Sequence, residues 1–100
     1  MSAVSAIASS GLRAAQLRMD TSAHNVANLN TPGFRRQTVN SEAVAGQGGV
    51  AASAGRAAQA GVAVESEAVE QIAATYAFEA SLQLLRTDDR MRGALLDERA

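Results

Sequence analysis

The sequence has no cysteine. Aromatic side chains are also few, at 3 % of the 100 residues. Without cysteine, a disulfide framework, an iron–sulfur cluster and thiol chemistry are all excluded. One histidine cannot build a typical zinc site. The net charge of -1 argues against nucleic acid as a partner, because nucleic-acid binding normally leaves a basic patch. We therefore expect no metal, no cofactor and no nucleic acid.

Large apolar side chains are also scarce. Apolar types reach 47 %, but nearly half of these residues are alanine, which buries little surface. A chain this short already buries a low fraction of its surface, so folding alone should be marginal, and partners are the usual remedy. No apolar run approaches the roughly 20 residues needed to span a bilayer. The first residues lack the positive region of a secretory signal, so we expect any export to proceed without a cleaved signal peptide.

Apolar residues at steps of three and four predict a long helix over residues 2–29. Their mean spacing is close to that of a nearly straight helix. After this helix, Pro32 and Gly33 predict a type II turn, because glycine takes a positive φ cheaply.

A second long helix is predicted over residues 66–98, with Ser66 as its N-cap and glutamates in its first turn. Two neighbouring apolar stripes make its apolar face wider than a two-helix seam requires. We expect other chains to bury the remainder.

Between the helices, residues 41–61 are dominated by Ala, Gly and Ser, which favours a flexible loop. The predicted fold class is therefore all-α: two long helices that pair as an antiparallel coiled-coil hairpin, joined by a flexible Ala/Gly-rich loop. We divide the chain into residues 1–36 (N-terminal helix and turn), residues 37–65 (flexible linker that can include a short β segment) and residues 66–100 (C-terminal helix).

Two stretches resemble the flagellar basal-body rod and hook family of bacteria. The N-terminal stretch contains Ser10-Gly11-Leu12, Arg18-Met19-Asp20, Asn25-Val26-Ala27-Asn28 and Asn30-Thr31-Pro32-Gly33-Phe34-Arg35-Arg36. The C-terminal stretch contains Val69-Glu70-Gln71, Tyr76-Ala77-Phe78-Glu79-Ala80, Leu85-Arg86-Thr87 and Asp89-Arg90-Met91. The middle is shorter than is usual in that family, and His24 stands where the family often has Asn.

The resemblance implies a structural subunit of the flagellar basal-body rod, in the periplasm-spanning part of the flagellum. It implies assembly through coiled-coil packing with other axial proteins, in homo- or hetero-oligomers, for flagellum-dependent motility. It also implies passage through the flagellar type III export apparatus. The rival hypothesis is a cytoplasmic helical-hairpin adaptor or regulator that binds a partner helix and uses the same apolar stripes.

We expect the assembly contacts to involve side chains from both helices and the turn. The predicted residues are Leu12, Met19, Asn25, Val26, Asn28, Asn30, Phe34, Arg35, Arg36, Ile72, Tyr76, Phe78, Leu82, Leu85, Met91 and Leu95. For the asparagines, capping and turn chemistry are the alternative to hydrogen bonds between subunits. Tyr76 and Phe78 face different directions on a helix, so one can fill the seam and the other an inter-subunit pocket.

No catalytic constellation stands out. The glycines at 46, 48 and 49 lack the strand–turn–helix context of a dinucleotide loop. His24 has no nucleophile at a specific spacing, and adjacent acidic residues on a helix point apart. We therefore expect no enzyme activity and no small-molecule substrate.

Overall fold

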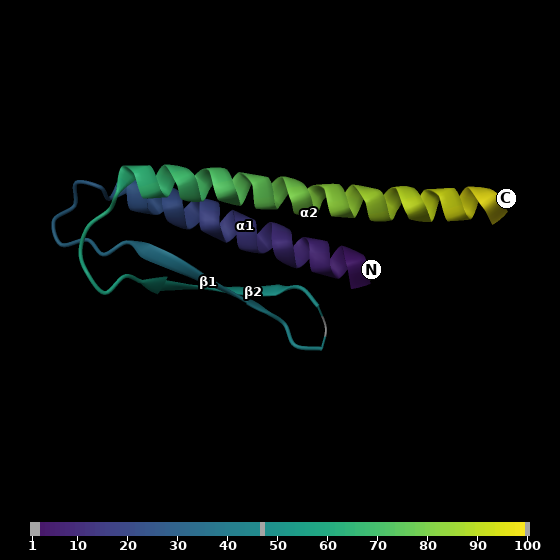
Figure 1. The fold of residues 1–100 in the computed structure, drawn as a ribbon, viewed down its shortest axis with the longest axis horizontal. Coiled ribbons are helices and arrows are strands. Elements are labelled where there is room, and N and C mark those ends of the chain that lie inside the picture. The colour runs from purple at the N-terminus through teal and green to yellow at the C-terminus, as the bar shows by residue number, and fades with distance from the viewer. Residues whose placement is uncertain (1–2, 47, 100) are drawn as a thin grey trace.

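The computed structural model describes residues 3–46 and 48–99. Four elements follow in order: α1 (Ala3–Ala27), β1 (Gln37–Ala43), β2 (Val50–Arg56) and α2 (Val64–Arg99). The two helices run antiparallel, and the strands form a hairpin along one side of α1 (Figure 1). The molecule is elongated, at 64 × 25 × 14 Å. Within the described residues, no helix combines the length and apolar character needed to cross a membrane.

The middle of the chain corrects the predicted fold class. β1 pairs with β2 antiparallel, from Gln37 opposite Arg56 to Ala43 opposite Val50. The all-α assignment with a flexible connecting loop is therefore wrong, although the two long helices are present. The division of the chain into three parts stays a prediction.

Contacts with α1 explain why a segment poor in β-formers adopts strands. The Asn25 side chain binds the backbone of Gln37, where β1 begins. Near the other end of α1, the Ser10 hydroxyl accepts a hydrogen bond of 3.0 Å from the N–H of Val50, where β2 begins. Asn25 and Ser10 are separated by about 22 Å of helix, and β1 spans about 20 Å. The hairpin is thus fixed to α1 at both ends, and this tertiary contact overrides local propensity.

The ends of the helices show one prediction confirmed and one wrong. The carbonyl of Thr31 accepts a hydrogen bond from the N–H of Phe34, and Gly33 has φ 73°. This geometry confirms the turn that Pro-Gly predicts. α2 begins at Val64, so Ser66 lies inside the helix and is not its N-cap. The N–H of Glu67 is already bonded to the carbonyl of Ala63.

The seam between the helices is built from small side chains. The buried hydrophobic residues are Ala8, Ala14, Ala15 and Ala74. At Gly11 the hydroxyl of Ser81 occupies the space that a Cβ would fill, so glycine permits the close approach of α1 and α2 there. Alanine and glycine let the helices lie close together, but their uniform surfaces give little specificity of register.

Candidate assembly interface

Polar side chains fix the end of the molecule where α1, α2 and β1 meet. Asn25 is fully buried. Its Nδ2 donates to the carbonyl of Gln37 over 2.9 Å, and its Oδ1 accepts from the N–H of Gln37 over 2.7 Å. The amide group therefore pairs with β1 as the backbone of a neighbouring strand would.

Glu67, in the first turn of α2, is the second member of this junction and is also fully buried. Its Oε1 accepts hydrogen bonds from Arg36 Nε at 2.9 Å and from Asn25 Nδ2 at 3.1 Å. The hydroxyl of Ser22 donates to its backbone carbonyl at 3.1 Å. Glu67 thus connects α2 to α1 and to the residue that precedes β1. Its second oxygen, Oε2, is buried and has no hydrogen-bond partner.

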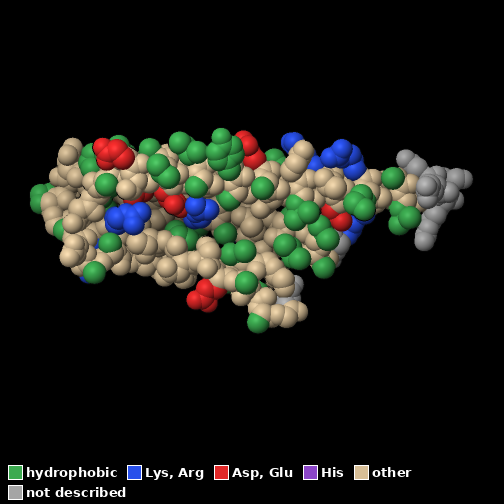
Figure 2. Space-filling model, viewed as in Figure 1, with side chains coloured by type: hydrophobic (Ala, Val, Ile, Leu, Met, Phe, Trp, Pro, Cys, Tyr) green, Lys and Arg blue, Asp and Glu red, His purple; other side chains and the backbone are tan. Residues whose placement is uncertain are grey.

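A second ion pair lies nearby, between Arg18, one turn before Ser22 on α1, and Glu70, one turn after Glu67 on α2. Arg18 Nε is 2.6 Å from Glu70 Oε1, and both side chains are partly exposed. These groups border a cavity of about 160 Å³, which is also lined by Ser22, Asn25, Arg36 and Glu67. Figure 2 shows basic and acidic side chains gathered over this part of the molecule. We call the group Arg18, Ser22, Asn25, Arg36, Gln37, Glu67 and Glu70 the polar junction.

The polar junction is suited to fixing the register of the two helices. Breaking a buried hydrogen-bonded ion pair is strongly unfavourable, so a shifted register that separates Glu67 from its donors is penalised. The alanine seam provides no comparable penalty. Among residues 3–46 and 48–99, no three His, Cys, Asp or Glu side chains gather in a way that could hold a metal ion.

Three of the predicted assembly residues near the turn make contacts within the chain. Asn28 Nδ2 donates to the carbonyl of His24 at 2.9 Å, which is a capping contact. The ring of Phe34 lies 5.6 Å from that of His24, edge to face, and Cζ of Arg56, the last residue of β2, lies 5.8 Å from the Phe34 ring centroid. Arg36 belongs to the polar junction. Whether any of them also contacts another subunit stays a prediction.

The remaining predicted residues of the N-terminal segment differ in exposure. Val26, Asn30 and Arg35 are exposed, whereas Leu12 and Met19 are partly buried. The Met19 sulfur is 3.9 Å from the hydroxyl of Thr75 on α2. Leu12 and Met19 are therefore partly covered within the chain, while the exposed residues are available to a neighbouring subunit.

On α2 the predicted residues divide between two faces. Phe78, Leu82 and Leu85 are partly buried, and Phe78 and Leu85 lie four and eleven residues after the buried Ala74. At these spacings they share the side of the helix that faces α1. Tyr76, by contrast, is 68 % exposed. Of the two aromatic residues of α2, Phe78 belongs to the seam and Tyr76 to the surface.

Tyr76 is part of an apolar stripe that we call the outer face of α2. It comprises Val69, Ile72, Tyr76, Met91 and Leu95, which are 56–68 % exposed. Their spacings place them along one side of a nearly straight helix, turned away from the buried Ala74. Ile72 and Tyr76 also line a shallow groove with Ala68, Gln71, Thr75 and Glu79. The stripe consists of two exposed apolar groups, Val69 to Tyr76 and Met91 to Leu95, about 22 Å apart along the helix.

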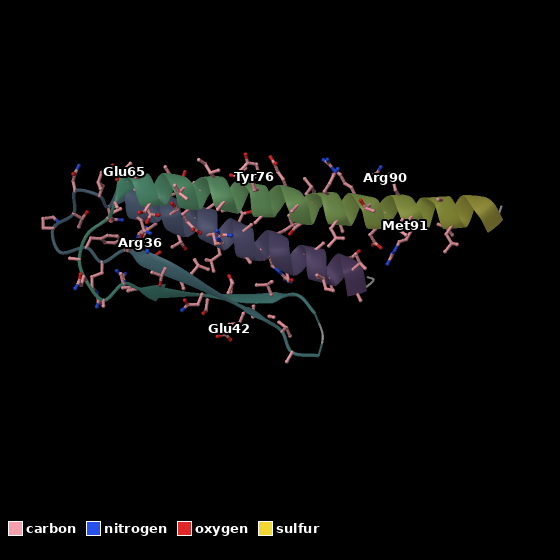
Figure 3. All side chains as sticks on the ribbon, in the orientation of Figure 1. Arg36, Glu42, Glu65, Tyr76, Arg90 and Met91 are labelled. Atoms are coloured by element: carbon pink, nitrogen blue, oxygen red, sulfur yellow. The ribbon has the colours of Figure 1, made fainter. Side chains whose placement is uncertain are left out.

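The last turns of α2 extend past α1. Near the start of α1, Ser5 donates to Asp88 over 2.9 Å. Beyond that contact α2 runs alone, and Figure 3 shows Arg90 and Met91 on this part of the helix. Met91, Leu95 and Leu96 are 56–68 % exposed there.

Sequence reasoning missed most of the polar junction. The sequence predicts only a helix-dipole role for the glutamates in the first turn of α2, Glu67 among them, and gives no reason to select Arg18, Ser22 or Gln37. A buried glutamate has no signal of its own in one sequence, because its burial depends on partners that lie 31 and 42 residues away in the chain. Asn25 was identified, but as an assembly residue.

The N-terminal part of the chain matches a known protein family. Residues 6–35 match the family model described as flagella basal body rod protein. That stretch covers most of α1, including Ser22 and Asn25 of the polar junction, and continues through the turn to Arg35. No curated protein matches the chain. Residues 6–35, on a helix that the polar junction holds against a longer partner helix, are thus similar to the flagella basal body rod protein family, a family of structural components.

Proposed function

We propose that the chain is a rod subunit that assembles by packing the outer face of α2 against helices of neighbouring axial proteins, copies or relatives, for flagellum-dependent motility. The observation that carries the proposal is the exposure of Val69, Ile72, Tyr76, Met91 and Leu95 along one side of α2. Exposed groups of large apolar side chains are typical of interaction sites. The similarity of residues 6–35 to the flagella basal body rod protein family supports a structural role in the basal body.

The energetics favour packing between copies or relatives. Full burial of one large apolar side chain contributes about 1.5–3 kcal/mol, so several such residues outweigh what the alanine seam provides. The stripe repeats at helical spacing and faces away from α1, which suits packing of the coiled-coil kind against another helix. The part of α2 beyond α1 adds Leu96 to the available surface.

Export is the second part of the proposal. We expect the subunit to pass unfolded through the flagellar type III export apparatus, without cleavage of a signal peptide. The small seam supports this, because a core of four buried alanines among the described residues resists unfolding little. Assembly would then supply the burial that the isolated chain lacks.

The direct test is a pair of substitutions on the outer face. Ile72→Ser with Tyr76→Ser should abolish or strongly reduce swimming and the amount of tagged chain in purified basal bodies, since both side chains are more than half exposed. Circular dichroism of the isolated variant should match that of the unaltered chain. A matched control is Ser66→Ala with Thr87→Ala, two exposed polar positions of the same helix, which should leave all three measurements unchanged.

Normal motility and normal recovery in basal bodies with both outer-face substitutions would contradict the proposal. A clean deletion with fractionation separates it from the adaptor hypothesis. Rod function requires the tagged chain in envelope-associated basal bodies and loss of motility on deletion. A chain found entirely in the cytosol of motile cells would support the adaptor.

A further inference from the structure

Two arginines of the polar junction keep unused donors beside the cavity that they border. Arg18 donates to Glu70 and Arg36 donates to Glu67, in each case through Nε. Among residues 3–46 and 48–99, neither arginine has a partner for its Nη groups. Both side chains are partly exposed, so these groups are accessible from outside. We propose that the cavity binds a carboxylate group, carried by an aspartate or glutamate side chain of a neighbouring subunit.

A buried hydroxyl opens into the same cavity. Thr21 lines it and is only 6 % exposed. Its hydroxyl has no hydrogen-bond partner within the described part of the chain, but Oγ1 is not sealed from solvent as Oε2 of Glu67 is. The hydroxyl therefore reaches the cavity. Because a buried polar group without a partner is unfavourable, this position favours a ligand that accepts its hydrogen bond.

The edge of β1 adds a backbone donor. Asn25 accepts a hydrogen bond from the N–H of Gln37 on the edge of β1 that does not face β2. Backbone groups two residues apart on a strand point the same way, so the N–H of Val39 points to that edge too. Val39 also lines the cavity. Guanidinium, hydroxyl and backbone donors thus meet there from α1, from β1 and from the residue before β1.

Donors outnumber acceptors in the accessible lining of the cavity. Each guanidinium carries five N–H donors, of which Nε supplies one. Of the two carboxylates in the lining, Glu67 is 0 % exposed and Glu70 already accepts from Arg18. The complementary ligand is therefore an acceptor. The Nη groups of a guanidinium present parallel N–H bonds, which match the two oxygens of a carboxylate.

A side chain of another subunit is the source that the size and the setting of the cavity favour. Its volume of about 160 Å³ is several times the roughly 30 Å³ of a water-sized group, so a side-chain carboxylate fits. A free carboxylate binds weakly from water, whereas one on a subunit that is already docked has a high effective concentration. The source therefore rests on the proposed function, but the chemistry of the cavity does not.

Acetate is the probe for the chemistry. In a titration of the isotope-labelled unaltered chain with sodium acetate, followed by NMR, we expect saturable shifts of the Val39 N–H and of the Arg18 and Arg36 side-chain signals. Sodium chloride at equal ionic strength should give no saturable shift. Amides of α2 after residue 90 are the internal control and should not respond. The absence of saturable shifts with acetate would overturn the site, whatever the role of the chain in the rod.

Thr21→Val tests the site without disturbing the ion pairs. The substitution keeps the shape of the side chain and removes the hydroxyl, so acetate should bind about tenfold more weakly. Urea unfolding should show no loss of stability, because the hydroxyl bonds nothing within the described chain. Thr87→Val, at an exposed position outside the cavity, is the matched control and should leave acetate affinity unchanged. Equal acetate affinity of the Thr21→Val and unaltered chains would contradict the proposal.

The source of the carboxylate is tested separately by assembly of the unaltered chain, followed by sedimentation. If a neighbouring subunit supplies the group, acetate should compete and reduce assembly relative to chloride at equal ionic strength. Thr21→Val should also assemble less than Thr87→Val. Acetate binding with no effect on assembly would overturn the neighbouring subunit as the source. That result would leave packing through the outer face of α2 intact, since Ile72→Ser with Tyr76→Ser tests it independently.

Discussion

The two ends of the helical pair are built in opposite ways. At one end, α1, α2 and β1 meet around Asn25 and Glu67, which are fully buried and hydrogen-bonded to each other. At the other end, α2 continues past α1 with Met91 and Leu95 exposed. The first end fixes how the chain folds, and the second offers surface to another molecule. Folding and assembly therefore depend on different ends of the helical pair, which the small alanine seam connects.

The substitution with the largest expected effect is Glu67→Ala. It leaves Arg36 and Asn25 without their shared acceptor. Removing one partner of a buried ion pair costs about 3–5 kcal/mol, and the lower value applies because Arg36 is 34 % exposed and can be hydrated. Urea unfolding followed by circular dichroism measures the loss. A loss below about 1 kcal/mol would mean that the polar junction does not hold this end together.

Asn25→Ala should have the next largest effect. It removes three hydrogen bonds and leaves both backbone groups of Gln37 unpaired. We expect a loss of about 2 kcal/mol in the free energy of unfolding. Asn30→Ala is the matched control, because Asn30 is exposed, and it should change stability by less than about 0.5 kcal/mol. Equal effects of the two substitutions would contradict the assignment.

Substitutions at the open end should separate assembly from folding. Met91→Ser with Leu95→Ser should reduce assembly, because these side chains contribute only when a neighbour covers them. The unfolding free energy of the isolated chain should change by no more than about 0.5 kcal/mol, since both residues are more than half exposed. Sedimentation measures the first quantity and urea unfolding the second. Loss of stability without loss of assembly would mean that the open end supports the fold and not assembly.

The smallest effect is expected for Arg92→Ala. Arg92 Nε lies 3.5 Å from Asp88 Oδ2, one turn away, and the arginine is half exposed. Exposed pairs at this spacing contribute about 0.3–0.5 kcal/mol. Urea unfolding at low and high salt should show little difference from the unaltered chain. A loss above about 1 kcal/mol would mean that the open end also supports the fold.

The sequence predicted those features that depend on local periodicity and turn chemistry. The two helices follow from apolar spacing, and the turn follows from Pro32-Gly33, as the φ of Gly33 confirms. The hairpin could not be predicted, because its strands are rich in Ala, Gly and Ser and depend on distant contacts from Asn25 and Ser10. The burial of Glu67 could not be predicted for the same reason. Local patterns do not report which distant side chains will meet.

Hydrogen exchange of the isolated chain, resolved by residue, tests the central claim most directly. Amides of α1 and α2 around Ser22, Asn25 and Glu67 should be the most protected, and those of α2 after residue 90 should exchange close to the unfolded rate. In the assembled form, protection should rise mainly after residue 90 and along the outer face of α2. Strong protection after residue 90 in the dilute isolated chain, or no gain there on assembly, would contradict the division between a folding end and an assembly end.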